Sequence, residues 1–564
     1  MTIRSAFSCT AGLLLLLLTT GGVPSAQAQT DGILFIDGPA QQFLERQKTL
    51  ERLPNTFVSS RPLSAYEMQA ALDSLTAHYG DELSAGEQQW VARLRNETPQ
   101  PGARLAQSIW GRLYPNGRDM AAVSGDGFSL QLNPLLYSSI GRASFSDSTN
   151  VTTWRNTRGV RASGQVGPIF FESRLTENQQ RPAIDQFEGG REGTAPRLGF
   201  VLSTEDRYYD YFRVSGSVGF RSKFFEVRFG RDQNRWGQGR GSVFLSDYAS
   251  PYDQLQIRTN VWRLQYTNLF AGFTSSERLP GQGERRDAVQ PRSYAAMHKL
   301  VLDLTDRVQI ELFESVVFAS ESDSTVSREG FDVAYLNPII FYRAVERELG
   351  SPDNAMVGIG GSWIVTPGLK LYGQFLLDEL IVGEIGNEWW GNKWGWMVGT
   401  HLVNPGIEHL EARVEYARLR PYLHAHVYPP NAYVHYGDGL GHPSGPNSQD
   451  ASLFIDYQPP GRWQAGLVAS FIERGRNTEA ENFGADPQID NDTRVRSRGV
   501  SLLQGVQQER WMLEAYGAVE VLPQLFAQIS IRADRLKDEE VGNRTFLQPS
   551  FSLRWGLPFD RSRF

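Results

Sequence analysis

The chain alternates apolar and polar side chains with a period of two from about residue 101 to its last residue. In Phe225-Glu226-Val227-Arg228-Phe229, this alternation puts three apolar residues on one face of a strand and two charged residues on the other. Three further segments show the same pattern: 308–312, 528–533 and 551–555. Because no helical pattern interrupts a stretch of roughly 450 residues, one closed antiparallel sheet explains it better than several packed sandwiches.

The polar face of these segments often carries Arg, Glu or Gln, which suits a wet lumen crossed by charge networks. A large soluble β-rich protein would alternate as well and is the alternative. The aromatic content of 12%, with 13 Trp, 21 Tyr and 31 Phe, favours the barrel, because aromatic girdles lie at both bilayer interfaces. At roughly 10 residues per strand plus turns, the stretch holds about 16 to 18 strands, and we predict an all-β transmembrane barrel of about 18.

The first thirty residues are expected to be a secretory signal peptide. Arg4 precedes the apolar run Leu13 to Leu18, and small residues frame Ala26-Gln27-Ala28, so we expect cleavage after Ala28. The apolar run is shorter than the roughly 20 residues that cross a bilayer. The only cysteine, Cys9, lies upstream of this run, so the mature chain can form neither a disulfide nor a thiolate metal site.

A helical pattern precedes the β-pattern. Ser64 with Glu67 and Ser84 with Glu87 each have the spacing of a capping box, in which a serine hydroxyl and a glutamate satisfy the first amides of a helix. Three amphipathic helices are predicted: Ala40 to Leu53, Ala65 to about Tyr79, and one that carries Trp90, Val91 and Leu94. They are expected to form a small bundle.

These patterns divide the chain into three parts. We predict a signal peptide at 1–28, a periplasmic helical bundle at 29–100 and a transmembrane barrel at 101–564. An even number of strands would leave the bundle and the terminal Phe564 on the periplasmic side, with the longer loops outside the cell. A terminal aromatic residue that closes an amphipathic strand also resembles the signal read by barrel-insertion machinery.

Charge and hydropathy exclude two other classes of protein. The net charge of −7 becomes −8 when Arg4 is removed, and there is no basic tract, so nucleic acid is not expected as a partner. The mean hydropathy is −0.38. No apolar run after residue 30 approaches the roughly 18 residues of a spanning helix, so we do not expect a helical membrane protein.

Three segments go beyond generic barrel chemistry and follow one another in order. They are Gly230-Arg231 with Arg235-Trp236-Gly237-Gln238-Gly239 and Ser242 to Ala249, then Leu371 to Glu379, and then Glu415 to Ser448. On these segments the sequence resembles the Wzi family of capsule-assembly outer-membrane proteins, with its Gly-Arg, Trp-Gly-x-Gly and Leu-Ser-x-x-Ala pattern. Gln238 replaces the Pro of that pattern and Tyr248 replaces its Asn. With the export signal and the helical preamble, the likeness covers essentially the whole chain.

The resemblance implies a largely plugged barrel of about 18 strands with periplasmic helices. It also implies an outer surface that binds capsular or exopolysaccharide and holds it to the cell. The expected partners are that polysaccharide and outer-membrane lipid, and the bundle is a candidate for docking polysaccharide export machinery. Five residues of the first two segments are expected to have structural roles in the lumen: Arg231, Arg235, Trp236, Asp378 and Glu379.

A tryptophan cluster is the candidate glycan platform. Sugars present apolar faces and rings of hydroxyls, which suit aromatic rings flanked by planar polar side chains. The candidate ligand-binding residues are Trp389, Trp390, Trp394, Trp396, Tyr433, His435 and Tyr436, and the tryptophans are interleaved with Asn387, Glu388 and Asn392. The alternative for the tryptophans is a membrane-interface girdle or lumen filling.

Asp378 and Glu379 raise the possibility of a glycosidase, which uses two carboxylates about 5 to 10 Å apart. Neighbours on a strand point to opposite faces, so these two cannot converge on one bond. We instead predict an ion pair with Arg231 or Arg235. No catalytic residue is therefore assigned, and the protein is not expected to be an enzyme.

Histidines and glycines in the third segment are candidates for cofactor sites. His424 and His426 would share a strand face, but a third zinc ligand with defined spacing is missing, which favours packing. Gly437 to Gly445 lacks the Lys-Ser or Lys-Thr of a phosphate loop and is interpreted as a turn. We expect no metal and no cofactor.

The sequence thus predicts an outer-membrane barrel that binds and anchors surface polysaccharide in capsule assembly. The main alternative is a porin or saccharide channel, which needs an open lumen where a plugged anchor needs a filled one. A membrane-embedded glycan hydrolase is the third hypothesis.

Overall fold

The computed structural model describes residues 32–95, 119–184, 188–189, 192–204, 207–276, 290–319, 331–339, 341–349 and 353–559. The predicted signal peptide, the boundary at residues 100 and 101, and Phe564 lie outside these residues. Among the described residues, none of the helices combines the length and the apolar character needed to cross a bilayer.

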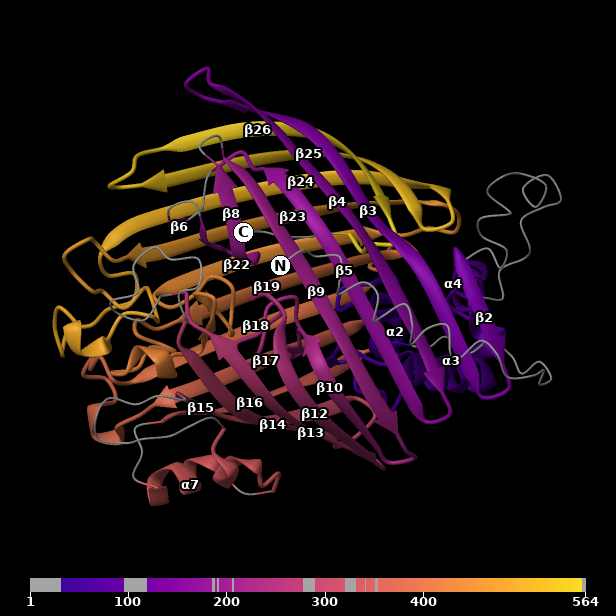
Figure 1. Ribbon diagram of the computed structural model, residues 1–564, viewed down its shortest axis with the longest axis horizontal. Helices are drawn as coiled ribbons and strands as arrows, with labels where there is room; N and C mark the ends of the chain where they lie inside the picture. Colours follow the sequence, from indigo (N-terminus) through magenta and orange to yellow (C-terminus); the bar gives the residue numbers. More distant parts are fainter. Residues whose placement is uncertain are drawn as a thin grey trace, which may run out of the picture.

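A closed antiparallel barrel of 18 strands contains most of the described chain (Figure 1). The strands are β3 (Phe128–Phe145), β4 (Asn150–Val166), β5 (Ile169–Arg181), β9 (Tyr208–Arg221), β10 (Phe225–Asp232), β12 (Tyr252–Val261), β13 (Leu264–Thr274), β14 (Arg292–Asp303), β15 (Val308–Ala319), β16 (Asn354–Thr366), β17 (Leu369–Glu379), β18 (Lys393–Val403), β19 (Leu410–Leu419), β22 (Ser448–Tyr457), β23 (Trp463–Arg476), β24 (Val506–Leu522), β25 (Leu525–Asp538) and β26 (Arg544–Trp555). The last strand closes the barrel on the first, with Trp555 opposite Leu136. The predicted fold class and strand number are confirmed.

Short strands accompany the barrel. β2 (Ala121–Gly125) pairs with β3, and β6 (Glu188–Gly189), β7 (Glu192–Ala195) and β8 (Gly199–Thr204) extend the sheet beside β9. Two small sheets are separate from the wall: β1 (Ser60–Arg61) with β11 (Arg235–Trp236), and β20 (Val434–His435) with β21 (Asp438–Gly439). β1 with β11 joins the N-terminal region to the connection between β10 and β12.

The period-two pattern puts apolar side chains outside the barrel and polar ones inside. In β10, Phe225 and Phe229 are exposed on the outer face, while Arg228 is buried on the lumen side. Lys299 and Glu311 also point inward and form a fully buried ion pair of 3.1 Å. The outer belt is apolar on every side; examples are Phe212, Val218, Phe229, Ile359, Val398, Val414 and Ile529. Such a belt suits lipid, and the buried charges suit a polar lumen.

The two ends of the barrel differ. At one end the strands are joined by tight turns, such as 167–168, 262–263 and 523–524. At the other end the connections are long: 233–251 between β10 and β12, 320–353 between β15 and β16, 380–392 between β17 and β18, 420–447 between β19 and β22, and 477–505 between β23 and β24. We call these the turn end and the loop end.

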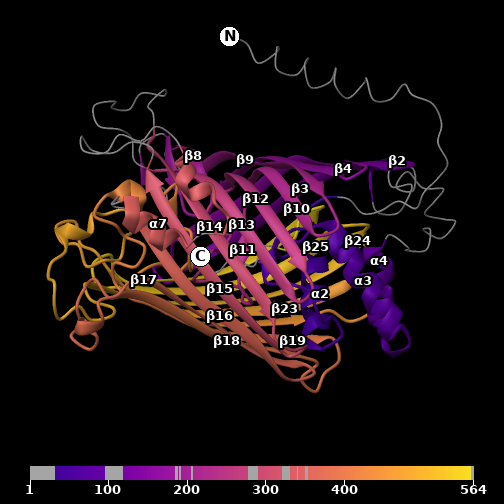
Figure 2. The same ribbon diagram turned by 90° about the horizontal axis from the view of Figure 1, so that it is seen from below.

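Helices α2 (Pro39–Thr49), α3 (Ala65–Tyr79) and α4 (Ala85–Leu94) fill the turn end (Figures 1 and 2). Both predicted capping boxes are present, and a common apolar core holds the helices together. The first helix ends at Thr49, four residues before its predicted end at Leu53, because the backbone turns at Glu51, whose φ is 63°. The amide of Gly368 donates to the carbonyl of Thr49 at 2.9 Å, so α2 is docked onto the barrel itself.

The connection 233–251 folds back into the lumen and forms a plug. Trp236, Val243, Phe244 and Leu245 are all fully buried. They belong to one apolar cluster with inward-facing side chains from strands on several sides of the barrel, including Leu269, Met297, Phe313, Met356, Tyr372 and Met397. A hydrophobic core therefore lies across the barrel interior at this level.

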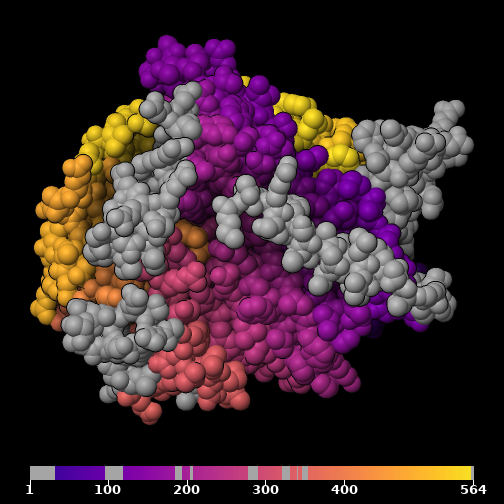
Figure 3. Space-filling view, viewed as in Figure 1, coloured from indigo at the N-terminus to yellow at the C-terminus, as the bar shows by residue number. Residues whose placement is uncertain are grey.

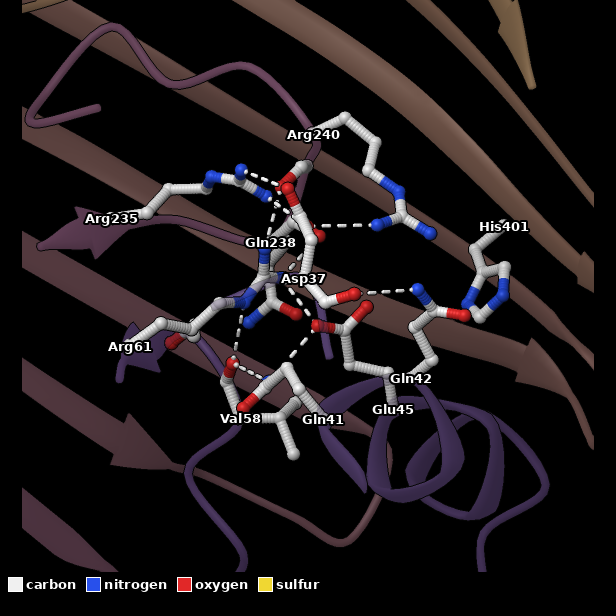
Figure 4. A network of polar contacts seen from close by, with 12 residues as sticks. Asp37, Gln41, Gln42, Glu45, Val58, Arg61, Arg235, Gln238, Arg240 and His401 are labelled. Carbon is white, nitrogen blue, oxygen red and sulfur yellow. Dashed lines mark hydrogen bonds and ion pairs between the residues drawn. The ribbon is translucent and has the colours of Figure 1, made fainter. Parts of the chain in front are cut away.

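A buried ion-pair network ties the plug to the N-terminal region (Figure 4). Asp37 accepts from Arg235 at 2.7 Å and from Arg240 at 2.9 Å, and Arg235 also pairs with Asp247. On α2, Glu45 pairs with Arg61 at 2.8 Å and with Arg413 of the barrel wall. Burial alone would raise the pKa of Asp37 and of Glu45, but the surrounding guanidinium groups outweigh burial and hold both pKa values well below their ordinary range.

Candidate glycan-binding surface

The structure divides the predicted tryptophan cluster into two pairs. Trp394 and Trp396 lie on β18 in alternation with the buried Lys393 and Met397, so they point outward toward the apolar belt. Trp389 and Trp390 lie instead in the connection 380–392 at the loop end. The first pair has the position of a membrane-interface girdle, and only the second pair is available to a ligand above the membrane.

Neighbouring loops hold Trp390 in place. Its ring meets that of Tyr422 edge to face, with centroids 5.9 Å apart. The guanidinium of Arg494, from the connection 477–505, lies 4.1 Å from the centroid of the Trp390 ring. The Trp390 amide donates to the carbonyl of Ser497 at 3.1 Å. A ring supported by two neighbouring connections is already ordered before a ligand arrives, which lowers the entropic cost of binding.

Trp389 lies beside Trp390, with ring centroids 5.7 Å apart and planes at 55°. Arg420 donates to the carbonyl of Trp389 at 3.2 Å. The two indoles thus form a bent aromatic surface edged by two guanidinium groups, those of Arg420 and Arg494. Rings with adjacent planar donors are the combination that suits a pyranose face and its hydroxyls.

A groove of about 680 Å³ runs next to this surface. Its polar lining is Arg343, Asp378, Glu379, His426, Asn491 and Asp492, and its other lining is Ala355, Val357, Leu377, Leu380, Ile381, Trp389, Trp390 and Val427. The groove therefore brings together the two tryptophans and the two carboxylates that the sequence singled out separately.

The predicted separation of Asp378 and Glu379 on opposite strand faces is wrong, because a β-bulge between Leu377 and Glu379 interrupts the alternation of β17 at its end. The predicted ion pair with Arg231 or Arg235 is wrong. Both carboxylates lie near one lysine, Lys393, at 3.8 Å from Asp378 and 3.2 Å from Glu379. The two arginines have other partners. Arg235 is held by Asp37 and Asp247 in the plug. Arg231 lies 3.9 Å from Asp253 on the adjacent strand.

Tyr433 and His435 lie inside the protein, at 0% and 1% exposure. The Tyr433 hydroxyl donates to the carbonyl of Phe244 in the plug at 2.8 Å. His435 packs between Tyr252 and Phe273, and Tyr436 lies against His435. These side chains fasten the connection 420–447 to the plug, and we leave them out of the glycan surface. The predicted turn at Gly437 to Gly445 begins in the turn between β20 and β21 and includes only β21 of that hairpin.

His424 and His426 do not share a strand face, contrary to the prediction. They lie in the irregular connection 420–447, and His424 has a φ of 72°, which a strand does not allow. The sequence alternation was too short there to distinguish a strand from a folded loop. In the described part of the chain, no group of three or more His, Cys, Asp or Glu side chains is arranged to hold a metal ion.

Sequence reasoning missed several residues of the surface: Arg343, Arg420, Tyr422, Asn491, Asp492 and Arg494. They come from three connections that are far apart in the sequence. No local pattern marks these residues, because their proximity depends on the closure of the barrel.

Comparison with solved structures supports the fold. The structure of Wzi from Escherichia coli, described as an outer-membrane protein involved in group 1 capsule assembly and a carbohydrate-binding β-barrel, has a TM-score of 0.56 at 12% identity. The match covers 94% of this chain and all of that one. OpdL from Pseudomonas aeruginosa matches 76% of this chain and 98% of its own at 9% identity, with a TM-score of 0.40.

A search of curated proteins gives no match to the sequence. The family model of capsule assembly protein Wzi matches residues 129–537, from the first barrel strand to the penultimate one. This region is well over half of the chain and includes the plug, the tryptophan loop and the connections around it. The chain therefore belongs to the capsule assembly protein Wzi family.

Proposed function

We propose that this outer-membrane β-barrel binds capsular or exopolysaccharide at its loop end and anchors the polymer to the cell surface during capsule assembly. The observation that carries the proposal is the Trp389–Trp390 pair, held by Tyr422 and Arg494 on connections that extend beyond the apolar belt. Family membership and the carbohydrate-binding description of the Escherichia coli relative support it.

Recognition of this kind needs no chemical step. An indole ring packs against the apolar face of a sugar, and guanidinium groups such as those of Arg420 and Arg494 donate to ring and hydroxyl oxygens. Each contact is weak, but a polysaccharide offers many repeats and a cell carries many barrels. Multivalent attachment of one polymer to several barrels would therefore hold it firmly.

We assign no catalytic role. Both Asp378 and Glu379 pair with Lys393 at the end of β17, and we propose a structural ion-pair role for them. The channel alternative is weakened by the plug, since the buried cluster around Trp236 and Phe244 lies across the lumen. Outer-membrane lipid would surround the belt, and the helices at the turn end would face the periplasm, where export machinery could dock.

Alanine substitution of both loop tryptophans tests the proposal. Trp389→Ala with Trp390→Ala is expected to weaken binding of the purified capsular polysaccharide by about tenfold or more, because each indole supplies a large, preorganised contact. The measurement is surface plasmon resonance with the detergent-solubilised full-length barrel, together with staining of capsule retained on cells.

The matched control is Trp363→Ala with Trp396→Ala, two tryptophans on wall strands that face the belt. These variants remove the same side chains without touching the loop surface, so they should bind polysaccharide like the wild type. Equal binding by the loop variant and the wild type would refute the proposal, and so would equal losses in both double variants.

A further inference from the structure

A segment of the chain lies against the outside of the barrel wall. Residues 331–349 include η3 (Val333–Leu336) and α7 (Tyr342–Leu349), within the connection between β15 and β16. Figures 1 and 2 both show α7 outside the strands near the loop end, and coral-coloured residues project at the lower edge of the space-filling view (Figure 3). We call residues 331–349 the outer segment.

Packing confirms that the outer segment covers the lipid-facing side of the wall. Tyr335 and Tyr342 pack on Phe270, Ala296, Val316, Phe318 and Ala355. The neighbours of these wall residues in sequence, including Leu269, Ala271, Ala295, Met297 and Val317, belong instead to the cluster inside the lumen. Since successive side chains on a strand point to opposite faces, the outer segment is outside.

The outer segment hides a polar pair that lipid could not satisfy. His298 Nε2 and Glu314 Oε2 are 2.8 Å apart on the outer face of β14 and β15. The Tyr342 ring stacks on His298 with centroids 4.5 Å apart, and the backbone amide of Arg343 donates to Glu314 at 2.9 Å. Ionisable groups in contact with hydrocarbon are costly, so the segment seals this pair beneath protein.

The free side of the outer segment is apolar. Val333 is 76% exposed, Ile339 83% and Phe341 75%. On the neighbouring connection 380–392, Val382 is 74% exposed and Ile385 is 62% exposed. The two connections flank β16, whose outward residues Val357 and Ile359 are also exposed, and this concentration of exposed apolar side chains indicates contact with hydrocarbon.

The groove of about 680 Å³ lies between these two connections, and its lining changes character from one end to the other. Ala355, Val357 and Leu377 are outward positions of β16 and β17 and continue the belt. Trp389 and Asn491 belong to the loops above. A ligand that fills the groove must therefore have an apolar part within the membrane and a sugar-like part at its surface.

Charge in the groove is compatible with an anionic head group. Three carboxylates line it: Asp378 and Glu379 share Lys393, and Asp492 lies 2.7 Å from Arg494. Arg343, on the outer segment, lines the same groove. Guanidinium groups bind phosphate through paired, charge-assisted hydrogen bonds.

We propose that the groove binds a glycolipid of the outer leaflet, with an acyl chain along Val357 and Leu377 and a phosphorylated sugar head group between Arg343 and Trp389. The outer segment would then insert the side chains of Ile339 and Phe341 into the outer leaflet. The head-group end shares Trp389 with the polysaccharide surface and in that respect rests on the proposed function, while the acyl end is independent of it.

Val357→Trp tests the acyl end, because the larger side chain fills the groove while staying compatible with a lipid-facing position. Ile359→Trp is the matched control, two residues along the same outward face but outside the groove. Full-length barrels are delipidated, incubated with equal amounts of lipid A and phosphatidylethanolamine, repurified in mild detergent and analysed by native mass spectrometry. Heat-dependent electrophoretic mobility verifies that each variant is folded.

The wild type and Ile359→Trp should retain one lipid A, and Val357→Trp should retain about tenfold less. Binding of soluble polysaccharide by Val357→Trp should be unchanged, which separates this site from the proposed function. Equal lipid A retention by Val357→Trp and the wild type would overturn the proposal. Retention of phosphatidylethanolamine as strong as that of lipid A, absence of lipid A from the wild type, or loss of polysaccharide binding in Val357→Trp would also overturn it.

Discussion

The two ends of the barrel use charged and aromatic side chains in different ways. At the turn end, the side chains of Arg61 and Glu45 pair at 1% and 3% exposure, inside a network that joins helix, plug and wall. At the loop end, those of Arg494 and Asp492 pair at 21% and 61% exposure, beside tryptophans that are partly open to solvent. The difference indicates that the turn end fixes the fold, while the loop end presents an ordered surface to ligands.

Among changes at the two ends, removal of the plug should have the largest effect, which is on the current through the barrel. Replacing residues 236–245 with a short Gly-Ser linker removes Trp236, Val243, Phe244 and Leu245 from the lumen core. We expect the wild type to give no steady current in a planar bilayer, and the variant to conduct when residues 39–94, which fill the turn end, are deleted as well. A large steady current through the wild type would show that the plug does not close the lumen and would favour the channel alternative.

Removing the charge of Glu45 should have the next largest effect, which is on the free energy of unfolding. Glu45→Gln leaves the guanidinium groups of Arg61 and Arg413 buried without their main counter-charge, which is expected to cost about 3 to 5 kcal/mol of unfolding free energy. Arg494→Ala at the loop end breaks an exposed pair and should cost at most about 1 kcal/mol. Urea titrations of folded barrels in lipid vesicles measure both. Similar losses for the two variants would contradict the contrast between the ends.

Acid should weaken the turn end by a smaller and more gradual amount. Burial raises and the neighbouring arginines more strongly lower the pKa of Asp37 and Glu45, so both stay ionised in the folded protein at pH values where the unfolded chain takes up protons. Their stabilisation is therefore complete above the unfolded pKa values of about 4, and it is lost as the pH falls from there toward the folded values.

The unfolding midpoint in urea should accordingly decline as the pH is lowered from about 5 to about 3. Glu45→Gln should show a shallower decline over the same range, because one of the two responsible carboxylates is gone. Glu82→Gln, at an exposed position on the same bundle, is the control and should keep the wild-type slope. If the urea midpoint falls equally steeply with pH in all three proteins, the network of Asp37 and Glu45 is not the cause of the acid sensitivity.

The barrel could be predicted because the residue pattern that specifies each strand is local in the sequence. Alternation such as that of Phe225 to Phe229 specifies two faces, and the length of the pattern specifies about 18 strands. The capping boxes at Ser64 and Ser84 likewise fixed the starts of α3 and α4. The partner of Asp378 was not predictable, because Lys393 is opposite Glu379 on the next strand and reaches Asp378 only through a β-bulge that depends on strand pairing.

The sequence by itself determined the strands, their two faces, the helical preamble and, through its ordered motifs, the family. Only the tertiary structure decided which tryptophans face lipid and which face the exterior. Trp389 and Trp396 are seven residues apart and chemically identical, but β18 begins between them, so one is in a loop and the other on the wall. The physical reason is that strand alternation assigns faces within an element, whereas closure of the barrel decides which distant connections meet.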